Sequence, residues 1–206
     1  MKRPYIIGIC GGSGSGKTLF ISKLKECFDE KQLCVISQDE YYKERQHQHV
    51  DENGVRNFDL PSAIDVEKFV EDLTKLSNGE EVQKLEYTFN NPAITPKMLT
   101  FKPAPVIVVE GIFIFYYKEI FELLDFSVFI NTKKKIKLKR RITRDAEERG
   151  YDLEHVLYTE KHHVHPAYLE FIKPFRDEVD IVIPNNENGF EKGFELIKLL
   201  IENKAQ

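Results

Sequence analysis

The residues with the clearest chemical meaning lie near the start of the chain, in the stretch Gly11-Gly12-Ser13-Gly14-Ser15-Gly16-Lys17-Thr18. This stretch fits Gly-x-x-x-x-Gly-Lys-Ser/Thr, a loop whose backbone N–H groups surround a phosphate chain. Its glycines allow positive φ and a close approach of the backbone to an anion. Lys17 can bring an ammonium to the β- and γ-phosphates, and Thr18 can offer a hydroxyl to Mg²⁺. The pattern predicts that the chain binds a nucleoside triphosphate, ATP or GTP, with Mg²⁺.

Two carboxylates could complete the chemistry of phosphoryl transfer. Asp39 comes soon after the apolar run 33–37, and Glu110 ends the apolar run that begins at Val106. Ligands of open α/β sheets sit beyond the carboxyl ends of the strands, so both side chains are expected near the phosphates. An aspartate can orient an acceptor hydroxyl and take its proton, and a glutamate can bind Mg²⁺. Read without context, either residue could instead be an ordinary strand-end acid that caps a turn.

Alternating strand and helix patterns indicate the elements that would position these residues. Apolar, β-prone runs predict parallel strands at 5–10, 33–37, 106–111, 126–130 and 180–184. Helical spacing of apolar residues follows the glycine loop (Phe20, Leu24, Cys27 and Phe28) and recurs at 66–76, 117–124, 153–164 and 190–201. Asp65 is the expected N-cap of the second of these helices, and Asn78-Gly79 the expected stop. We therefore expect one α/β domain over 1–206, a P-loop three-layer sandwich with helices on both faces of a parallel sheet.

Two segments are expected to project from this domain. Residues 43–57 are polar and predict a mobile loop, and the β-prone pieces between Val82 and Phe101 predict a strand pair that projects from the main sheet. Residues 133–149 carry nine lysines and arginines beside a narrow apolar stripe of Leu138, Ile142 and Ala146, which predicts a cationic helix. The next helix is expected to be bent near His165-Pro166 and to end before Pro174.

Composition narrows the classes of partner. The net charge of −4 argues against nucleic acid as the main partner, and no apolar run approaches the length of a membrane span. We see no signal peptide, and the three scattered cysteines suit a reducing compartment, so a cytoplasmic location is expected. The histidines at 162, 163 and 165 have no acidic or cysteine partner at a zinc-ligand spacing, so no zinc site is expected.

In this order the motifs resemble the uridine kinase family, also called uridine–cytidine kinases, which are P-loop kinases related to phosphoribulokinase. The resemblance runs from Ile7 to Pro184. Beyond the glycine loop it rests on four stretches: 36–42 (Ile-Ser-Gln-Asp-Glu-Tyr-Tyr), 57–59 (Asn-Phe-Asp), 109–112 (Val-Glu-Gly-Ile) and 140–145 (Arg-Arg-Ile-Thr-Arg-Asp) with 148–150 (Glu-Arg-Gly). It implies ATP-dependent phosphorylation of the 5′-hydroxyl of uridine or cytidine, to UMP or CMP in pyrimidine salvage, by a homotetramer.

The same resemblance implies a role for each matching residue. Asp39 would be the catalytic base, and Thr18, Glu110 and Asp39 would surround Mg²⁺. Asp59 and Arg141 would hold the ribose 2′- and 3′-hydroxyls, which makes sense because a carboxylate facing a vicinal diol can accept two hydrogen bonds. Arg144 and Arg149 would approach the phosphates beside Lys17 from a helical lid over about 133–165. Tyr87 and Phe89 would lie beside the nucleobase, in a β-hairpin appendage over about 45–104 that binds substrate.

Three positions depart from the family where the base would be recognised. After Tyr87-Thr88-Phe89 the family places a histidine and then an arginine, and this chain has Asn90-Asn91-Pro92-Ala93. Tyr151 stands where a second base-contacting arginine is common, and Thr159 where a glutamine is expected. The ribose, phosphate and metal positions are kept. Phosphoryl transfer therefore follows from the resemblance, whereas the identity of the base does not.

Three other functions are consistent with parts of the sequence. A P-loop kinase of another hydroxyl substrate, such as a different nucleoside or a sugar phosphate, would share the glycine loop and Asp39. A nucleotide-binding regulator without turnover would not need Asp39, and the chain has no Asn-Lys-x-Asp guanine motif. An RNA-binding module could use the cationic helix, but no aromatic residue interrupts that run to stack bases.

Overall fold

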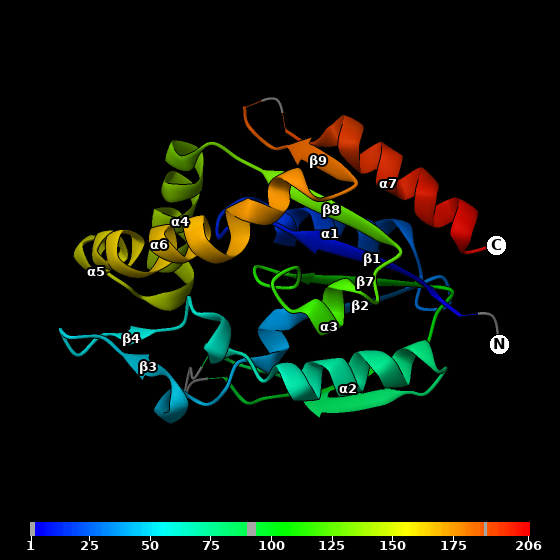
Figure 1. Ribbon diagram of the computed structural model, residues 1–206, viewed down its shortest axis with the longest axis horizontal. Coiled ribbons are helices and arrows are strands. Elements are labelled where there is room, and N and C mark those ends of the chain that lie inside the picture. Colours follow the sequence, from blue (N-terminus) through cyan, green and yellow to red (C-terminus); the bar gives the residue numbers. More distant parts are fainter. Residues whose placement is uncertain (1–2, 90–93, 188) are drawn as a thin grey trace.

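A five-stranded parallel sheet forms the centre of the computed structural model, which describes residues 3–89, 94–187 and 189–206 apart from the Glu148 side chain. Its strand order is β2–β7–β1–β8–β9 (Figure 1). The bounds are β1 Tyr5–Cys10, β2 Leu33–Ser37, β7 Val106–Gly111, β8 Phe126–Asn131 and β9 Ile181–Pro184. All five strands were predicted from apolar runs, because a parallel sheet buried on both faces uses continuous hydrophobic strands. The phosphate loop follows the central strand, β1.

Helices cover both faces of the sheet, as predicted. Helices α1 (Lys17–Cys27) and α7 (Glu191–Lys204) pack on one face, where Ile7 and Ile9 of β1 join the core around Phe20. Helices α2 (Val66–Ser77) and α3 (Lys118–Phe121) pack on the other, where Ile6 meets the second core. Successive residues of β1 thus serve opposite cores, as strand geometry requires. Cys27, expected on the buried stripe of α1, is exposed because that helix ends there.

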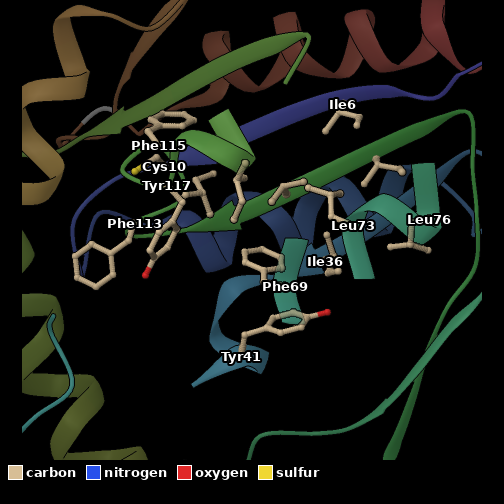
Figure 2. Close-up of a cluster of buried hydrophobic side chains, with 14 of the residues drawn as sticks. Ile6, Cys10, Ile36, Tyr41, Phe69, Leu73, Leu76, Phe113, Phe115 and Tyr117 are labelled. Carbon is tan, nitrogen blue, oxygen red and sulfur yellow. The ribbon is translucent and has the colours of Figure 1, made fainter. Parts of the chain in front are cut away.

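The core beneath α2 determines where Asp39 lies. Figure 2 shows Phe69, Leu73 and Leu76 of α2 gathered with side chains from β1, β2 and the segment after β7. Tyr41 stacks on Phe69 with ring centroids 4.4 Å apart, and its hydroxyl donates to Asp72 at 3.0 Å. Because Tyr41 ends the 3-10 turn Gln38–Tyr41, this anchor fixes the turn that carries Asp39. Helix α2 itself is capped by Asp65, which accepts from the Lys68 N–H, and it ends at Asn78, as predicted.

Two antiparallel hairpins project beyond the sheet. The pair β5 (Val82–Leu85) and β6 (Met98–Phe101) confirms the predicted strand pair, while Pro92 and its neighbours 90–93 lie outside the described residues. The segment 43–57, expected to be a mobile loop, has regular secondary structure. The segment contains a 3-10 turn, Arg45–His47, and a second hairpin of β3 (His49–Val50) and β4 (Arg56–Asn57). Alternation of apolar and polar residues could not predict this hairpin, because each of its strands is only two residues long.

The region expected to form the lid is helical, and it lies beside β3 and β4 (Figure 1). Helix α4 (Lys134–Arg149) is followed by α5 (Leu153–Thr159), α6 (His165–Ala167) and π-helical segments at Glu160–Val164 and Tyr168–Ile172. A 3-10 turn, Lys173–Asp177, contains Pro174. The helix predicted from the stripe of Leu138, Ile142 and Ala146 is confirmed, although among its described side chains the buried ones are Arg141 and Asp145, while Leu138 and Ile142 are half-buried. Among the described residues, no helix is long and apolar enough to cross a membrane.

Candidate active site

The phosphate loop is held in shape by side chains from two neighbouring strands. Asn185, just after β9, donates through Nδ2 to the carbonyl of Ser15 at 2.7 Å, and Thr132, just after β8, donates to it at 3.0 Å. Gly16 has φ +98°, and a Cβ there would lie 2.2 Å from Asn185 Nδ2. Lys17 is buried and its ammonium donates to the Gly11 carbonyl at 2.7 Å. The loop is therefore fixed before a phosphate arrives, and Asn185 and Thr132 are supporting residues that the motif did not predict.

Asp39 and Glu110 lie together at the ends of β2 and β7. Ser37 is paired with Glu110 in the sheet, and its hydroxyl donates to Glu110 Oε1 while accepting the Asp39 N–H at 3.2 Å. Burial and, next to it, the negative charge of Asp39 raise the pKa of Glu110 to about 7, although the Lys17 ammonium opposes both. Ser37, not Asp39, caps the turn, so the structure excludes the reading of Asp39 as the turn's cap. Thr18 lies exposed in the first turn of α1.

The three arginines expected at the substrate converge on one carboxylate. Asp145, with its side chain 2% exposed, accepts from Arg141 Nε at 3.1 Å and from Arg144 Nη2 at 2.8 Å, and it lies 3.4 Å from Arg149 Nη1. Each guanidinium is thus held by a charge-assisted contact to the same residue. From the sequence, Asp145 is named only as part of the stretch 140–145 and is assigned no role. Apolar periodicity cannot predict that a helix face is buried by ion pairs.

Arg141 of α4 also forms hydrogen bonds with the helical segments that follow α4. Besides Asp145, it donates to Thr159 Oγ1 at 2.7 Å and to Glu160 Oε2 at 3.2 Å. Thr159, the position where a base-contacting glutamine was expected, is buried, and its hydroxyl reaches the His155 carbonyl at 3.0 Å. The threonine therefore supports Arg141.

Asp59 lies within electrostatic reach of these arginines. Its backbone N–H donates to Asn57 Oδ1 at 2.9 Å. Burial raises the pKa of Asp59, and Arg141 is the strongest opposing influence. The structure thus brings Asp59 and Arg141 to one region without a direct hydrogen bond between them among the described contacts.

Aromatic rings gather beside Asp59. Tyr87 and Phe89 lie 5.1 Å apart between ring centroids, and Tyr42 stacks on Tyr87 at 5.5 Å. Phe58 meets Tyr42 edge to face, and the Arg149 guanidinium lies 4.9 Å from the Phe89 ring centroid. Tyr42 and Phe58 are members of this group that sequence reasoning missed, although both stand in the quoted motifs.

Tyr151 is placed apart from that aromatic group. It stacks on His155 with centroids 4.5 Å apart and remains 38% exposed. The described contacts link it to the start of α5 and not to the rings around Tyr42.

The β3–β4 hairpin is tied to the lid through Asp51. This carboxylate accepts from the Tyr158 hydroxyl at 2.7 Å and lies 2.8 Å from His163 Nε2. Burial alone would raise the pKa of Asp51, but hydrogen bonds from Tyr158, the Val55 N–H and His163 bring it well below its usual range. These contacts explain why a polar segment without periodicity is nevertheless ordered.

A cavity of about 80 Å³ lies where the phosphate loop, the end of β7 and the lid meet. Its walls include Ser13, Asp59, Ile112, Lys137, Glu160 and Tyr168. A phosphate at the loop and a hydroxyl compound near Asp59 would meet at this space, so the arrangement can join a triphosphate to an acceptor alcohol.

Comparison with known proteins gives a consistent result. The model of the "Phosphoribulokinase / Uridine kinase family" matches residues 6–188. A uridine kinase of Clostridium tetani is 37% identical over 191 residues, which cover 93% of this chain and 90% of that protein. A uridine kinase of Halalkalibacterium halodurans is 34% identical and covers 99% of this chain and 98% of that protein.

A solved structure supports the fold alone. D-glycerate 3-kinase from Cryptococcus neoformans superposes with a TM-score of 0.61 at 15% identity, covering 90% of this chain and 87% of that one. At that identity the likeness extends to the arrangement of the sheet and helices.

Proposed function

The chain belongs to the phosphoribulokinase/uridine kinase family, and on that premise we propose that it transfers the γ-phosphoryl group of ATP to the 5′-hydroxyl of a pyrimidine ribonucleoside. Uridine is the first acceptor to test and cytidine the second, giving UMP or CMP as in pyrimidine salvage. The observation that carries the proposal is the grouping of Lys17, Glu110 and Asp39 at the carboxyl ends of β1, β7 and β2. The two relatives compared above are named uridine kinases, which supports this choice of acceptor.

The chain's own residues divide the work of the reaction. Residues 11–18 would hold the phosphate chain with backbone N–H groups, and Lys17 would leave the Gly11 carbonyl for a phosphate oxygen. Asp39 would orient the 5′-hydroxyl and accept its proton. Arg144 and Arg149 would exchange part of their contact with Asp145 for the phosphate oxygens as the lid closes and excludes water.

Mg²⁺ fits the residues present. Two acidic groups stand close enough to influence each other, and the raised pKa of Glu110, which comes from burial and then from Asp39, supports binding of a cation there. Mg²⁺ is usually held by one or two carboxylates together with substrate phosphates, which matches Asp39, Glu110 and the Thr18 hydroxyl. When bound, the ion would neutralise charge that develops on the phosphates.

The acceptor would lie between the hairpins and the lid. Asp59 and Arg141 would bind the ribose hydroxyls, and the rings of Tyr87, Phe89 and Tyr42 would cover the base. We propose that Tyr151 contributes at the edge of this site. Because Thr159 is engaged with Arg141, recognition of the base would depend on the aromatic group more than on that position.

A panel of acceptors tests the function, and one substitution tests the mechanism. Turnover should be measured with uridine, cytidine, purine nucleosides and sugar phosphates, with ATP and GTP as donors, and scored by kcat/KM. A protein that phosphorylates no nucleoside is not the enzyme proposed.

In Asp39→Asn we expect nucleotide binding to be retained and kcat to fall by roughly 10²–10⁴. Asp65→Asn is the matched control, because asparagine still caps α2 away from the site. Turnover of Asp39→Asn equal to that of the control would remove Asp39 from the mechanism.

Two further properties belong to the proposal. The three cysteines are free thiols, which supports a cytoplasmic location. A homotetramer is implied by the family resemblance, and light scattering on the purified protein would test it.

A further inference from the structure

Lys137 on α4 is a cation for which the reaction described above has no use. Its ammonium lies 3.4 Å from the centroid of the Tyr168 ring. A Cβ added to Gly12 would lie 3.0 Å from Lys137 Nζ, and one added to Gly14 would lie 2.6 Å from the Lys137 carbonyl. Helix α4 therefore touches the phosphate loop at this residue, with the ammonium against the loop's first half.

The ammonium lacks an acceptor in the part of the chain that the structure describes. Its recorded contact there is the face of Tyr168, and no hydrogen bond or ion pair joins it to a carboxylate or carbonyl. An ammonium carries three N–H donors, and Lys137 is half-buried, so leaving these donors without a protein acceptor is costly. Burial accordingly lowers the pKa of Lys137 to about 8, with Glu160 opposing the shift and Lys17 and Lys134 adding to it.

The Lys137 side chain lines the cavity in which the phosphoryl group would pass from the nucleotide to the acceptor. Lys137 and Tyr168 line it from the lid, Ser13 lines it from the phosphate loop, and Asp59 lines it from the proposed acceptor side. Lys17 reaches the loop from α1, where its ammonium donates to the Gly11 carbonyl. The two lysines are near enough to influence each other electrostatically, so an anion between them would satisfy both.

We propose that Lys137 is a second phosphate-binding lysine, which contacts the terminal phosphate of the nucleoside triphosphate from the lid while Tyr168 holds its ammonium over the loop. This inference rests on the proposed function and deepens it. It gives the lid a charge that is already at the phosphate site before Arg144 and Arg149 leave Asp145.

The test compares Lys137→Met with Lys137→Arg and with Lys139→Met, an exposed lysine of the same helix that serves as control. Methionine keeps a long flexible side chain against Tyr168 and removes the charge. Calorimetry would measure the affinity for the non-hydrolysable β,γ-imido analogue of ATP and for ADP, both with Mg²⁺, beside the melting temperature without ligand.

In Lys137→Met we expect affinity for the triphosphate analogue to fall roughly ten- to hundredfold, the value of a lost charge-assisted hydrogen bond, with ADP affinity changed far less. The melting temperature should hold or rise, because an unpaired buried cation is gone; a lysine with a purely structural role would lower it. Lys137→Arg should retain most of the discrimination between the two nucleotides, which also decides the matter if the methionine variant folds poorly.

Equal losses for both nucleotides, or no loss beyond that of Lys139→Met, would overturn the proposal. Uridine turnover by the unsubstituted protein is measured separately. A protein that discriminates through Lys137 but phosphorylates no nucleoside would refute the proposed acceptor and leave this inference standing.

Discussion

Replacing Glu110 with glutamine is expected to stabilise the ligand-free protein at pH 8 and to do so much less at pH 5. The pKa of this carboxyl rises from its ordinary value of 4.5 to about 7 in the folded protein, first because of burial and then because of Asp39. Each unit is worth about 1.4 kcal/mol, so an ionised Glu110 costs the folded state about 3 kcal/mol. Glutamine removes that cost and can still accept from the Ser37 hydroxyl.

The direction of the pH dependence follows from the raised pKa. Below about pH 4.5 the group is protonated in both states and does not oppose folding. As pH rises to 7 and beyond, the unfolded chain ionises freely while the folded protein resists, so the stability contributed by this group is lost. Since Glu110 is partly solvent-exposed, we expect a net gain for Glu110→Gln of about 2 kcal/mol at pH 8 relative to pH 5.

Urea unfolding at pH 5, 6, 7 and 8, without Mg²⁺ or nucleotide, measures this difference. Glu119→Gln, at an exposed carboxylate of α3, is the control and should show no such trend. Adding MgATP should reverse the ranking, because the wild type gains more from a bound cation than the variant does. If the difference between wild type and Glu110→Gln is the same at pH 5 and pH 8, the carboxylate pair does not raise this pKa and the reasoning fails.

Two other substitutions probe the loop and the core. In Gly14→Ala the residue must keep φ +75° and its Cβ would meet the Lys137 carbonyl at 2.6 Å, so nucleotide affinity measured by calorimetry should fall by tenfold or more; retained affinity would show that the loop adjusts freely. Phe69→Ala empties a fully buried site stacked on Tyr41 and should lower the free energy of unfolding by about 3–5 kcal/mol. Its kcat/KM per folded molecule should also drop, because Tyr41 anchors the turn carrying Asp39, and an unchanged value would contradict that link.

The sheet and the phosphate loop could be predicted because their signals are local. Strands buried on both faces must be apolar throughout, and the loop before α1 needs its particular residues at fixed spacing. The positions of Asp39 and Glu110 then follow from the rule that ligands lie at the carboxyl ends of parallel strands. This reasoning also predicted the β5–β6 hairpin, from β-prone pieces interrupted by prolines.

Interactions between distant polar residues could not be predicted in the same way. The β3–β4 hairpin is ordered by Asp51 and its partners 107 and 112 residues away, and no local pattern encodes such pairs. Among the described side chains of α4, the buried ones are likewise Arg141 and Asp145, so the apolar stripe predicted the helix but not which of its residues are buried. The sequence signal for this pair is that Arg141 and Asp145, of opposite charge, stand four positions apart on a predicted helix.

The contacts of Asp51 join two segments that are far apart in the sequence, the β3–β4 hairpin and the helical region 153–164. Asp51, in the turn of the hairpin, accepts a hydrogen bond from Tyr158 of α5 and contacts His163 in the following π-helical segment. Moving the hairpin away from this helical region would therefore require breaking the contacts of Asp51 with Tyr158 and His163 together.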